Sequence, residues 1–261
     1  MNHKKKDIDK VNSIINNCKK CRLHLTRTNA LCGEGNLHAR VMLIAQAPGD
    51  NEDREGKMFI GPSGKVLDEL LIETGVRRDH LYMTNLIKCR LPEYRKPKQD
   101  EIDACCSFLE NEIKLVDPEV IVPLGYYATR YFFKRDSLSI SMPTSRADFY
   151  NLYGRLFLYQ NKKVYPLPHP ASLLYNMSFR PMTLDKYKKL RVLLQPCKWF
   201  FVCPLKRFCD MGKLDQYWIN FYCKGDWGSC IRYKMEERGE YHPDWMLPDG
   251  TFEETLHELN K

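Results

Sequence analysis

The sequence predicts an α/β fold in which a central, mostly parallel four-stranded sheet lies between two layers of helices, a three-layer α/β/α arrangement. Two observations favour it. Short, continuous apolar runs such as Val41–Ala45 and Val120–Leu124 are typical of strands that are buried on both faces. These runs alternate with longer segments whose apolar residues recur at helical spacing, which indicates β-α-β units. A small Cys-rich domain is expected to follow.

The predicted elements alternate along the chain. Helices are expected at Asp7–Asn17, Gly64–Glu73, Lys98–Val116, from Gly125 through Phe133, and at Asp185–Leu194. Strands are expected at Val41–Ala45, Leu81–Leu86 and Val120–Leu124, with a final strand pair at Leu156–Tyr159 and Val164–Leu167. Gly75 is the expected C-terminal cap of the helix Gly64–Glu73. Pro48 and Gly49 end the first strand, and an acidic loop follows them.

Charge and cysteine content narrow the class of protein. Residues 1–196 contain 32 of the 41 Lys and Arg residues but 22 of the 33 Asp and Glu residues, so a polyanion such as nucleic acid is the natural partner. No segment has the roughly 20 apolar residues of a membrane span, and the start lacks a signal peptide. We therefore expect a cytoplasmic protein without membrane association. In that reducing compartment the 11 cysteines are expected to bind a metal or cluster rather than form disulfides.

Polar motifs stand where the predicted strands end. IAQAPGDNED follows the first strand, with GKMFIGPSGK after it, TNLIKCR ends the second strand, and PLPHPASLL ends the last. The carboxyl ends of parallel strands meet at one edge of a sheet, which is where such proteins place their ligand crevice. The sequence therefore predicts a binding site at this edge.

These motifs and the cysteines resemble, in order and spacing, the family-four uracil-DNA glycosylases, the iron-sulfur branch of the uracil-DNA glycosylase superfamily. The resemblance covers about Cys18 to Leu194. It implies a monofunctional base excision repair enzyme that flips uracil out of single- or double-stranded DNA and hydrolyses its N-glycosidic bond, leaving an abasic site. It also implies a 4Fe-4S cluster whose ligands fall on Cys18, Cys21, Cys89 and Cys105, with the adjacent Cys106 as the alternative to Cys105.

The resemblance assigns roles to individual pocket residues. Phe59 matches the aromatic side chain that stacks on uracil, Asn85 matches the amide that pairs with it, and His169 matches the histidine that faces uracil O2. A carboxamide complements uracil O4 and N3–H but not the corresponding edge of cytosine. The backbone amides of Gln46 and Ala47 are expected to donate to the same oxygen as His169.

The first loop departs from the family pattern. The usual Gly-Glu pair is Ala45-Gln46 here, and Ala47 stands where a related branch has an aspartate, so Ala47 cannot activate water. Glu52 is the carboxylate left in the loop, and we expect it to exclude the methyl group of thymine or to order water. Two alternatives stay open: a catalytically weak or inactive iron-sulfur DNA-binding protein, and a glycosylase for another deaminated base such as hypoxanthine.

The segment HPASLLYN is expected to touch the DNA minor groove. Leu173 or Leu174 would then act as a wedge that fills the space left by the flipped base. Basic residues around the predicted site are candidates for phosphate contacts: Lys65, Lys88, Arg90, Arg95, Lys96 and Arg180.

The chain is expected to divide into a catalytic domain, residues 1–196, and a Cys-rich module, residues 197–261. About 65 residues rarely build an adequate core unaided, so a metal or cluster is expected there. The expected ligands are Cys203, Cys209, Cys223 and Cys230, with Cys197 spare. Their spacing lacks a C-x2-C pair, which favours a second iron-sulfur cluster over zinc. We expect a monomer whose module extends the DNA surface, binds a protein partner or braces the main domain.

Overall fold

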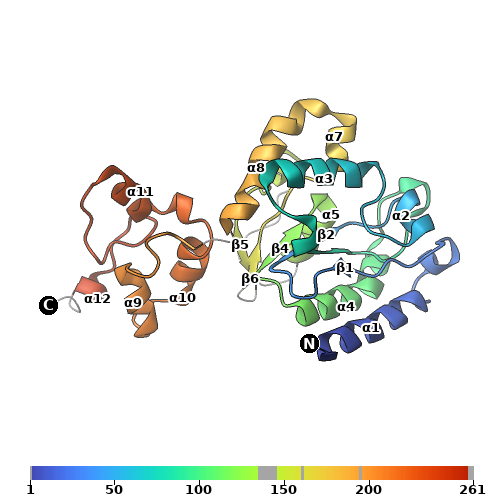
Figure 1. Ribbon diagram of the computed structural model, residues 1–261, viewed down its shortest axis with the longest axis horizontal. Helices are drawn as coiled ribbons and strands as arrows, with labels where there is room; N and C mark the ends of the chain where they lie inside the picture. Colours follow the sequence, from blue (N-terminus) through green and yellow to red (C-terminus); the bar gives the residue numbers. More distant parts are fainter. Residues whose placement is uncertain (1, 135–145, 160–161, 194–195, 258–261) are drawn as a thin grey trace.

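A single six-stranded sheet forms the centre of the molecule. The computed structural model describes residues 2–134, 146–159, 162–193 and 196–257. The strands of these residues are β1 Glu34–Gly35, β2 Val41–Ala45, β3 Leu81–Asn85, β4 Val120–Pro123, β5 Phe157–Tyr159 and β6 Lys162–Val164, in the order β1-β3-β2-β4-β6-β5 (Figure 1). The four central strands are parallel, and β1 and β5 are antiparallel at the two edges. The predicted four-stranded sheet is therefore corrected to a six-stranded one.

Helices connect the strands and cover both faces of the sheet. They are α1 Asn2–Asn16, α2 Asp50–Glu55, α3 Pro62–Thr74, α4 Gln99–Val116, α5 Gly125–Lys134, α6 Arg146–Tyr150, α7 Ala171–Tyr175 and α8 Arg180–Leu193. In the C-terminal segment they are α9 Pro204–Asp210, α10 Gln216–Trp218, α11 Ile231–Arg238 and α12 Glu254–His257. None of the helices described is long and apolar enough to cross a membrane.

Alternate residues of the central strands enter two separate cores. In β2, Met42 and Ile44 join a core with residues of α1, α4 and α5, whereas Leu43 joins a core with residues of α3, α7 and α8. This alternation is why every residue of β2 is buried and why the strand reads as one apolar run. The helices α1 and α4 lie on one side of the sheet and α3, α7 and α8 on the other (Figure 1), which is the three-layer arrangement that was predicted.

The register of the sheet brings the predicted site motifs to one edge. Ala45, the last residue of β2, pairs with Asn85, the last residue of β3. The bridge between Leu124 and Leu167 continues the parallel alignment of β4 and β6 toward His169. The loops that follow β2, β3 and β6 therefore leave the sheet side by side.

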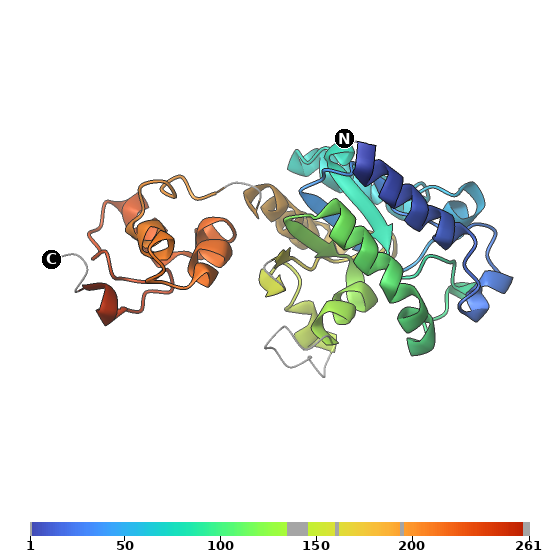
Figure 2. The same ribbon diagram turned by 90° about the horizontal axis from the view of Figure 1, so that it is seen from below.

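The C-terminal segment lies at the end of the molecule where β5 and β6 form the sheet edge (Figures 1 and 2). Phe221 packs against the core on the α3 and α8 side. The buried Lys163 of β6 donates hydrogen bonds to the carbonyl oxygens of Leu193, at 2.8 Å, and of Lys224. Burial lowers the pKa of Lys163 to about 8. A lysine of the sheet thus ties the segment to the main body.

Candidate active site

A cavity of about 640 Å³ opens at the carboxyl edge of the sheet. Its walls come from the loop after β2, the end of β3, the loop after β6 and helix α7. Among its lining residues are eight that the sequence singled out: Gln46, Ala47, Glu52, Phe59, Asn85, Arg95, His169 and Leu174. Residues from three separate stretches of the chain therefore share one space of a size suited to a small molecule or a base.

Asn85 is held at the end of β3 with its carboxamide at the cavity. Only 2% of the residue is exposed, and the backbone pairing continues past it, since Leu86 N–H donates to Ala45 O at 2.8 Å. Its Nδ2 donates to Met58 Sδ at 3.1 Å. A thioether is a weak acceptor, so the carbonyl oxygen of a bound ligand would be the stronger partner for this amide.

Phe59 has a strained backbone that aims its ring at the same cavity. Its φ of 52° lies in the left-handed region, which costs a non-glycine residue about 1–3 kcal/mol. Arg78 holds this conformation by donating to Met58 O at 2.7 Å and to Phe59 O at 3.3 Å. Gly64 permits it, since a Cβ there would lie 1.9 Å from Phe59 O. The centroids of the Phe59 and His169 rings are 6.4 Å apart.

His169 presents a neutral N–H group to the cavity. Its Nδ1 accepts a hydrogen bond from Ala171 N–H at 3.1 Å, so the proton of the neutral ring resides on Nε2. Burial lowers the pKa of His169 to about 4, which keeps the ring uncharged at neutral pH. Ser172 Oγ donates to His169 O at 2.8 Å and fixes the turn. Gly125, with φ of +79°, leaves room for the imidazole.

Glu52 lies on α2 and supports the loop that carries Phe59. The residue is 7% exposed, and its Oε1 accepts a hydrogen bond from Gly61 N–H at 2.8 Å. Gly49 is required opposite it, because a Cβ there would lie 2.5 Å from Glu52 Oε2. The neighbouring Asp53 accepts the backbone N–H of Thr28 at 2.9 Å and is likewise engaged inside the protein. Glu52 therefore lines the cavity while it closes the loop.

Four cysteines from distant parts of the chain line a second, narrow cavity: Cys18, Cys21, Cys89 and Cys105. All four are free thiols. Arg27 Nη1 donates to Cys89 Sγ at 3.1 Å, and Lys20 N–H donates to Cys18 Sγ at 3.5 Å. Four thiols with N–H donors directed at their sulfurs are a donor set that fits an iron-sulfur cluster. The described residues contain no group of His, Cys, Asp or Glu side chains arranged for a single metal ion.

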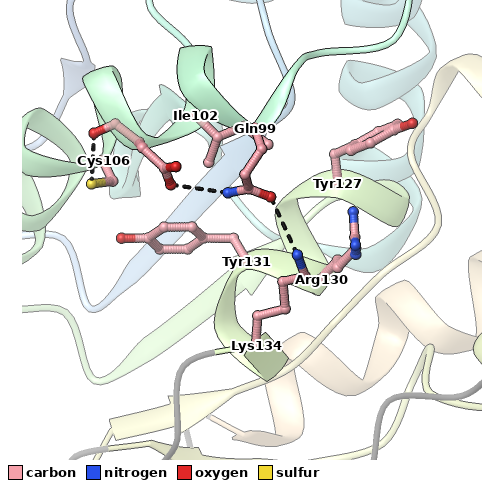
Figure 3. A pocket seen from close by; sticks show the side chains of 8 residues that line it. Gln99, Ile102, Cys106, Tyr127, Arg130, Tyr131 and Lys134 are labelled. Atoms are coloured by element: carbon pink, nitrogen blue, oxygen red, sulfur yellow. Dashed lines mark hydrogen bonds between the residues drawn. The ribbon is translucent and has the colours of Figure 1, made fainter.

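Cys106 does not face this cavity. Successive residues of a helix point about 100° apart, because one turn takes 3.6 residues. Cys106 lies instead in a pocket between α4 and α5, together with Tyr127 and Tyr131 (Figure 3). There its thiol donates to Asp103 O at 3.1 Å. Of the two adjacent cysteines, Cys105 is the one that lies with the other three.

Two predicted DNA contacts are corrected by the structure. Leu173 is 0% exposed and belongs to the core on the α3 side, whereas Leu174, one position along α7, is 50% exposed at the cavity. Lys88 is buried, and its Nζ lies 2.5 Å from Glu112 Oε2 and 2.6 Å from Thr84 Oγ1. Neither Leu173 nor Lys88 can therefore reach DNA.

The other basic candidates differ in their surroundings. Arg90 forms an ion pair with Asp50 at 3.0 Å. Arg95 is paired with Glu101, and Arg180 of α8 is paired with Glu69 and Glu73 of α3. These arginines brace loops and helices. Lys65 in the first turns of α3 and Lys96 are exposed, so their ammonium groups can contact phosphate.

The ligand set expected for the C-terminal segment, Cys203, Cys209, Cys223 and Cys230, stays a prediction. One cavity is lined by Cys197, Cys203, Cys223 and Cys230, whereas Cys209 is absent from its lining. The thiol of Cys209 donates to Asp215 O at 3.4 Å instead. The turns of the chain bring Cys197, which sequence spacing left spare, beside the other three.

Sequence reasoning missed several residues at the active-site cavity. Arg78 stands in a charged stretch with no motif to distinguish it, and only the fold brings it to Phe59. Tyr94 and Tyr175 line the cavity and are 78% and 89% exposed. The Tyr94 hydroxyl donates to Asp50. Tyr175 directly follows the HPASLL motif and Tyr94 lies shortly after TNLIKCR, so large aromatic residues next to two site motifs were the available signal.

The fold and cavity define an α/β protein with a ligand crevice at the carboxyl edge of a parallel sheet. Comparison with known proteins then indicates one superfamily within this class. Residues 32–192 match the uracil DNA glycosylase superfamily. The chain is 38% identical over 191 residues to the type-4 uracil-DNA glycosylase of Sulfurisphaera tokodaii (71% of this chain, 84% of the relative). It is 40% identical over 192 residues to that of Saccharolobus solfataricus (72% and 87%) and 37% identical over 187 residues to that of Thermotoga maritima (71% and 93%). The chain therefore belongs to the uracil-DNA glycosylase superfamily, in its type-4 family.

Proposed function

We propose that this protein is a DNA repair glycosylase that flips uracil out of DNA and hydrolyses the bond between uracil N1 and the sugar C1′, leaving an abasic site. One observation carries the proposal: Asn85, Phe59 and His169 line a single cavity. The cavity offers an aromatic face, a carboxamide and a neutral N–H donor, which are the groups that a flipped pyrimidine requires.

Recognition of the base rests on Asn85 and Phe59. The carboxamide of Asn85 supplies a donor for uracil O4 and an acceptor for uracil N3–H. Cytosine has an amino donor and an unprotonated ring nitrogen at these positions, so it would leave both groups of a fixed amide unpaired. Phe59 lines the cavity, and its ring offers a stacking surface for the pyrimidine.

Cleavage of the glycosidic bond leaves its electron pair on uracil, and the negative charge spreads from N1 to O2. We expect His169 Nε2–H to donate to O2 as this charge develops, which is electrostatic stabilisation of the leaving group. Water then adds to C1′ and releases a proton to solvent. Ala47 carries no carboxylate, and one oxygen of Glu52 already accepts from Gly61 N–H, so the water is only weakly activated. Stabilisation of the leaving group therefore provides most of the lowering of the activation barrier.

DNA is expected to approach along α7 and the start of α3. Leu174 and Tyr175 project from the cavity mouth, and the following segment exposes two more apolar side chains, Met177 at 59% and Met182 at 44%. An exposed apolar group of this kind can replace the flipped nucleotide in the base stack. Lys65 in the first turns of α3 is the phosphate contact that we propose.

We propose that Cys18, Cys21, Cys89 and Cys105 hold a 4Fe-4S cluster with a structural role. The four residues come from the segment after α1, the segment after β3 and helix α4, so a cluster would fasten these parts together. Cys105→Ala is expected to release this cluster, whereas Cys106→Ala should retain it. Iron content per chain measures the difference.

We also propose the division of the chain into a catalytic domain, residues 1–196, and a C-terminal module, residues 197–261. The superfamily match ends at residue 192, and the apolar clusters of the module are separate from the two cores that flank the sheet. We propose that the enzyme acts as a monomer on DNA and that the module braces the main domain or binds a protein partner.

The purified protein should be incubated with a duplex that contains one uracil and then treated with alkali. Strand scission at the uracil is expected, and Asn85→Ala should abolish it while iron content is unchanged. Intact DNA that still binds the protein would instead indicate a binding protein without catalysis. A duplex with hypoxanthine tests the remaining alternative, because a faster reaction on that base would assign the cavity to a different lesion.

A further inference from the structure

The C-terminal segment has little apolar core of its own. One small cluster is Cys197, Phe200, Cys209, Ile219 and Cys223, and the other is Leu205, Phe208, Leu247 and Leu256. Its described residues, 196–257, form short helices and one isolated bridge, with no strand ladder. A unit of this size and composition usually needs a disulfide or a metal group to fold, and its five cysteines are free thiols.

Four of these cysteines surround one cavity: Cys197, Cys203, Cys223 and Cys230. They lie in four separate turns. Cys203 precedes α9, Cys230 precedes α11, and Cys223 ends the π-helical turn Ile219–Cys223. Cys197 N–H donates to Cys223 O at 2.7 Å, which fixes two of the four backbones against each other. A group bound here would join all four turns.

The same cavity contains buried nitrogen atoms without acceptors. Arg232 is 4% exposed and His242 has a 7% exposed side chain, and both line the cavity. Arg232 Nε and Nδ1 of His242 have no hydrogen-bond partner among the residues described, whereas His242 Nε2 lies 3.1 Å from Glu236 Oε1. Arg232 Nη1, in contrast, donates to three backbone carbonyls, the closest at 2.8 Å. A buried donor that is left unpaired is unfavourable, so an acceptor is expected in the cavity.

The arrangement of the thiols indicates what that acceptor is. Zinc binds sulfur at about 2.3 Å, so four thiolates around one zinc ion lie within about 4 Å of each other. Cys197, Cys203, Cys223 and Cys230 line a cavity together with Arg232 and His242. Thiols that surround a cavity fit a larger group that offers one iron to each thiolate. The cavity of Cys18, Cys21, Cys89 and Cys105 has the same character, with Arg27 donating to a cysteine sulfur.

We propose that Cys197, Cys203, Cys223 and Cys230 hold a second iron-sulfur cluster, of the four-iron type, and that it provides the core of the C-terminal segment. The cluster with its four thiolates is anionic, and its sulfurs accept hydrogen bonds from Arg232 and His242. None of these residues lines the active-site cavity, so the proposal stands independently of the glycosylase activity.

Iron, zinc and acid-labile sulfide are to be measured on the full chain purified without oxygen. About eight iron and eight sulfide per chain are expected, the content of two four-iron clusters. Cys197→Ala and Cys105→Ala should each lower iron to about four per chain, since each removes one cluster. Cys209→Ala is the matched control and should retain about eight. Uracil release should be the same in Cys197→Ala and the unmodified protein.

Three results would overturn the proposal. About four iron and one zinc per unmodified chain would make the site a zinc site. Loss of iron in Cys209→Ala but not in Cys197→Ala would return the site to the ligand set expected from sequence spacing. His242→Phe leaves all four thiols in place, so it should keep about eight iron and change the reduction potential of only one cluster. Unchanged potentials of both clusters in a soluble His242→Phe protein would remove the histidine from the site.

Discussion

At the residue scale, the role proposed for His169 is to stabilise the leaving group. Its Nδ1 is occupied by Ala171 N–H, and burial lowers its pKa to about 4, so a neutral imidazole faces the cavity. The hydrogen bond from a neutral donor strengthens as negative charge develops on uracil O2. It therefore stabilises the transition state more than the ground state.

The first prediction is therefore that His169→Asn lowers the single-turnover rate of uracil release about 10²- to 10³-fold, the usual effect of losing one such donor. The rate of the unmodified protein should be level from pH 8 to 5 and fall only as the pH drops through about 4. Histidine in the unfolded chain takes up its proton near pH 6.5, so stability should also decline as the pH falls from about 6.5 to 4. A rate that falls by half as the pH rises through about 6.5 would show that a charged imidazole is the active form.

Arg78 acts on the site through the backbone of Phe59. It donates to the carbonyl oxygens of residues 58 and 59 and thereby holds Phe59 at a φ of 52°. Such strain persists only where surrounding contacts enforce it.

The second prediction is that Arg78→Met lowers the rate of uracil release about tenfold, equivalent to about 1.4 kcal/mol, because Phe59 relaxes away from the stacking position. Affinity for undamaged DNA, measured by fluorescence anisotropy, should change little. Arg77→Met is the matched control, since Arg77 pairs only with the exposed Asp79 in the described contacts. An equal loss in both variants would attribute the effect to charge rather than to the conformation of Phe59.

At the scale of the elements, a buried polar cluster joins β3, α4 and the segment before β1. Glu112 of α4 accepts from Lys88 Nζ at 2.5 Å, from Thr84 Oγ1 at 2.7 Å and from Gly33 N–H at 2.9 Å. Glu112 is 0% and Lys88 1% exposed. Each charge depends on the other, because an unpaired charge in this interior would be strongly unfavourable.

The third prediction follows from that dependence. Glu112→Ala should lower the free energy of unfolding by about 3–5 kcal/mol, because it leaves the Lys88 ammonium buried without its carboxylate. The double variant Lys88→Met with Glu112→Leu should recover most of the loss, since neither charge remains. Urea denaturation measures both, with iron content as a check on the nearby cysteine cavity. A double variant as unstable as Glu112→Ala would point to packing rather than charge.

The elements also show what a sequence can and cannot predict. The strand Val41–Ala45 was predicted to its exact bounds, because burial on both faces makes it a continuous apolar run. β1 has two residues and α2 reads DNEDRE, so neither has an apolar period to detect. The site motifs were predictable because they stand at strand ends. Whether Lys88 turns inward, or which cysteines line one cavity, depends on the path of the chain in three dimensions.

At the scale of the whole molecule, charge is divided between the main body and the C-terminal segment. Residues 1–196 have an excess of ten basic residues, whereas residues 197–261 contain nine basic and eleven acidic residues. The segment meets the main body at β6, where Lys163 donates to two of its neighbouring carbonyls, and no residue of the segment described lines the active-site cavity. A segment at that edge, with a slight negative charge, is poorly suited to contact DNA phosphates.

The last prediction tests this division. A chain that ends at Pro196 should release uracil at the rate of the full chain, because the cavity is complete without the segment. Its net charge becomes more positive, so DNA binding at low salt should tighten slightly. The slope of the logarithm of the DNA-binding constant against the logarithm of the salt concentration should stay the same. Each phosphate that the protein neutralises contributes about 0.9 to the magnitude of that slope. A slope shallower by about one or more would mean that the removed segment neutralises phosphates and that DNA runs past β6 as well as across the cavity.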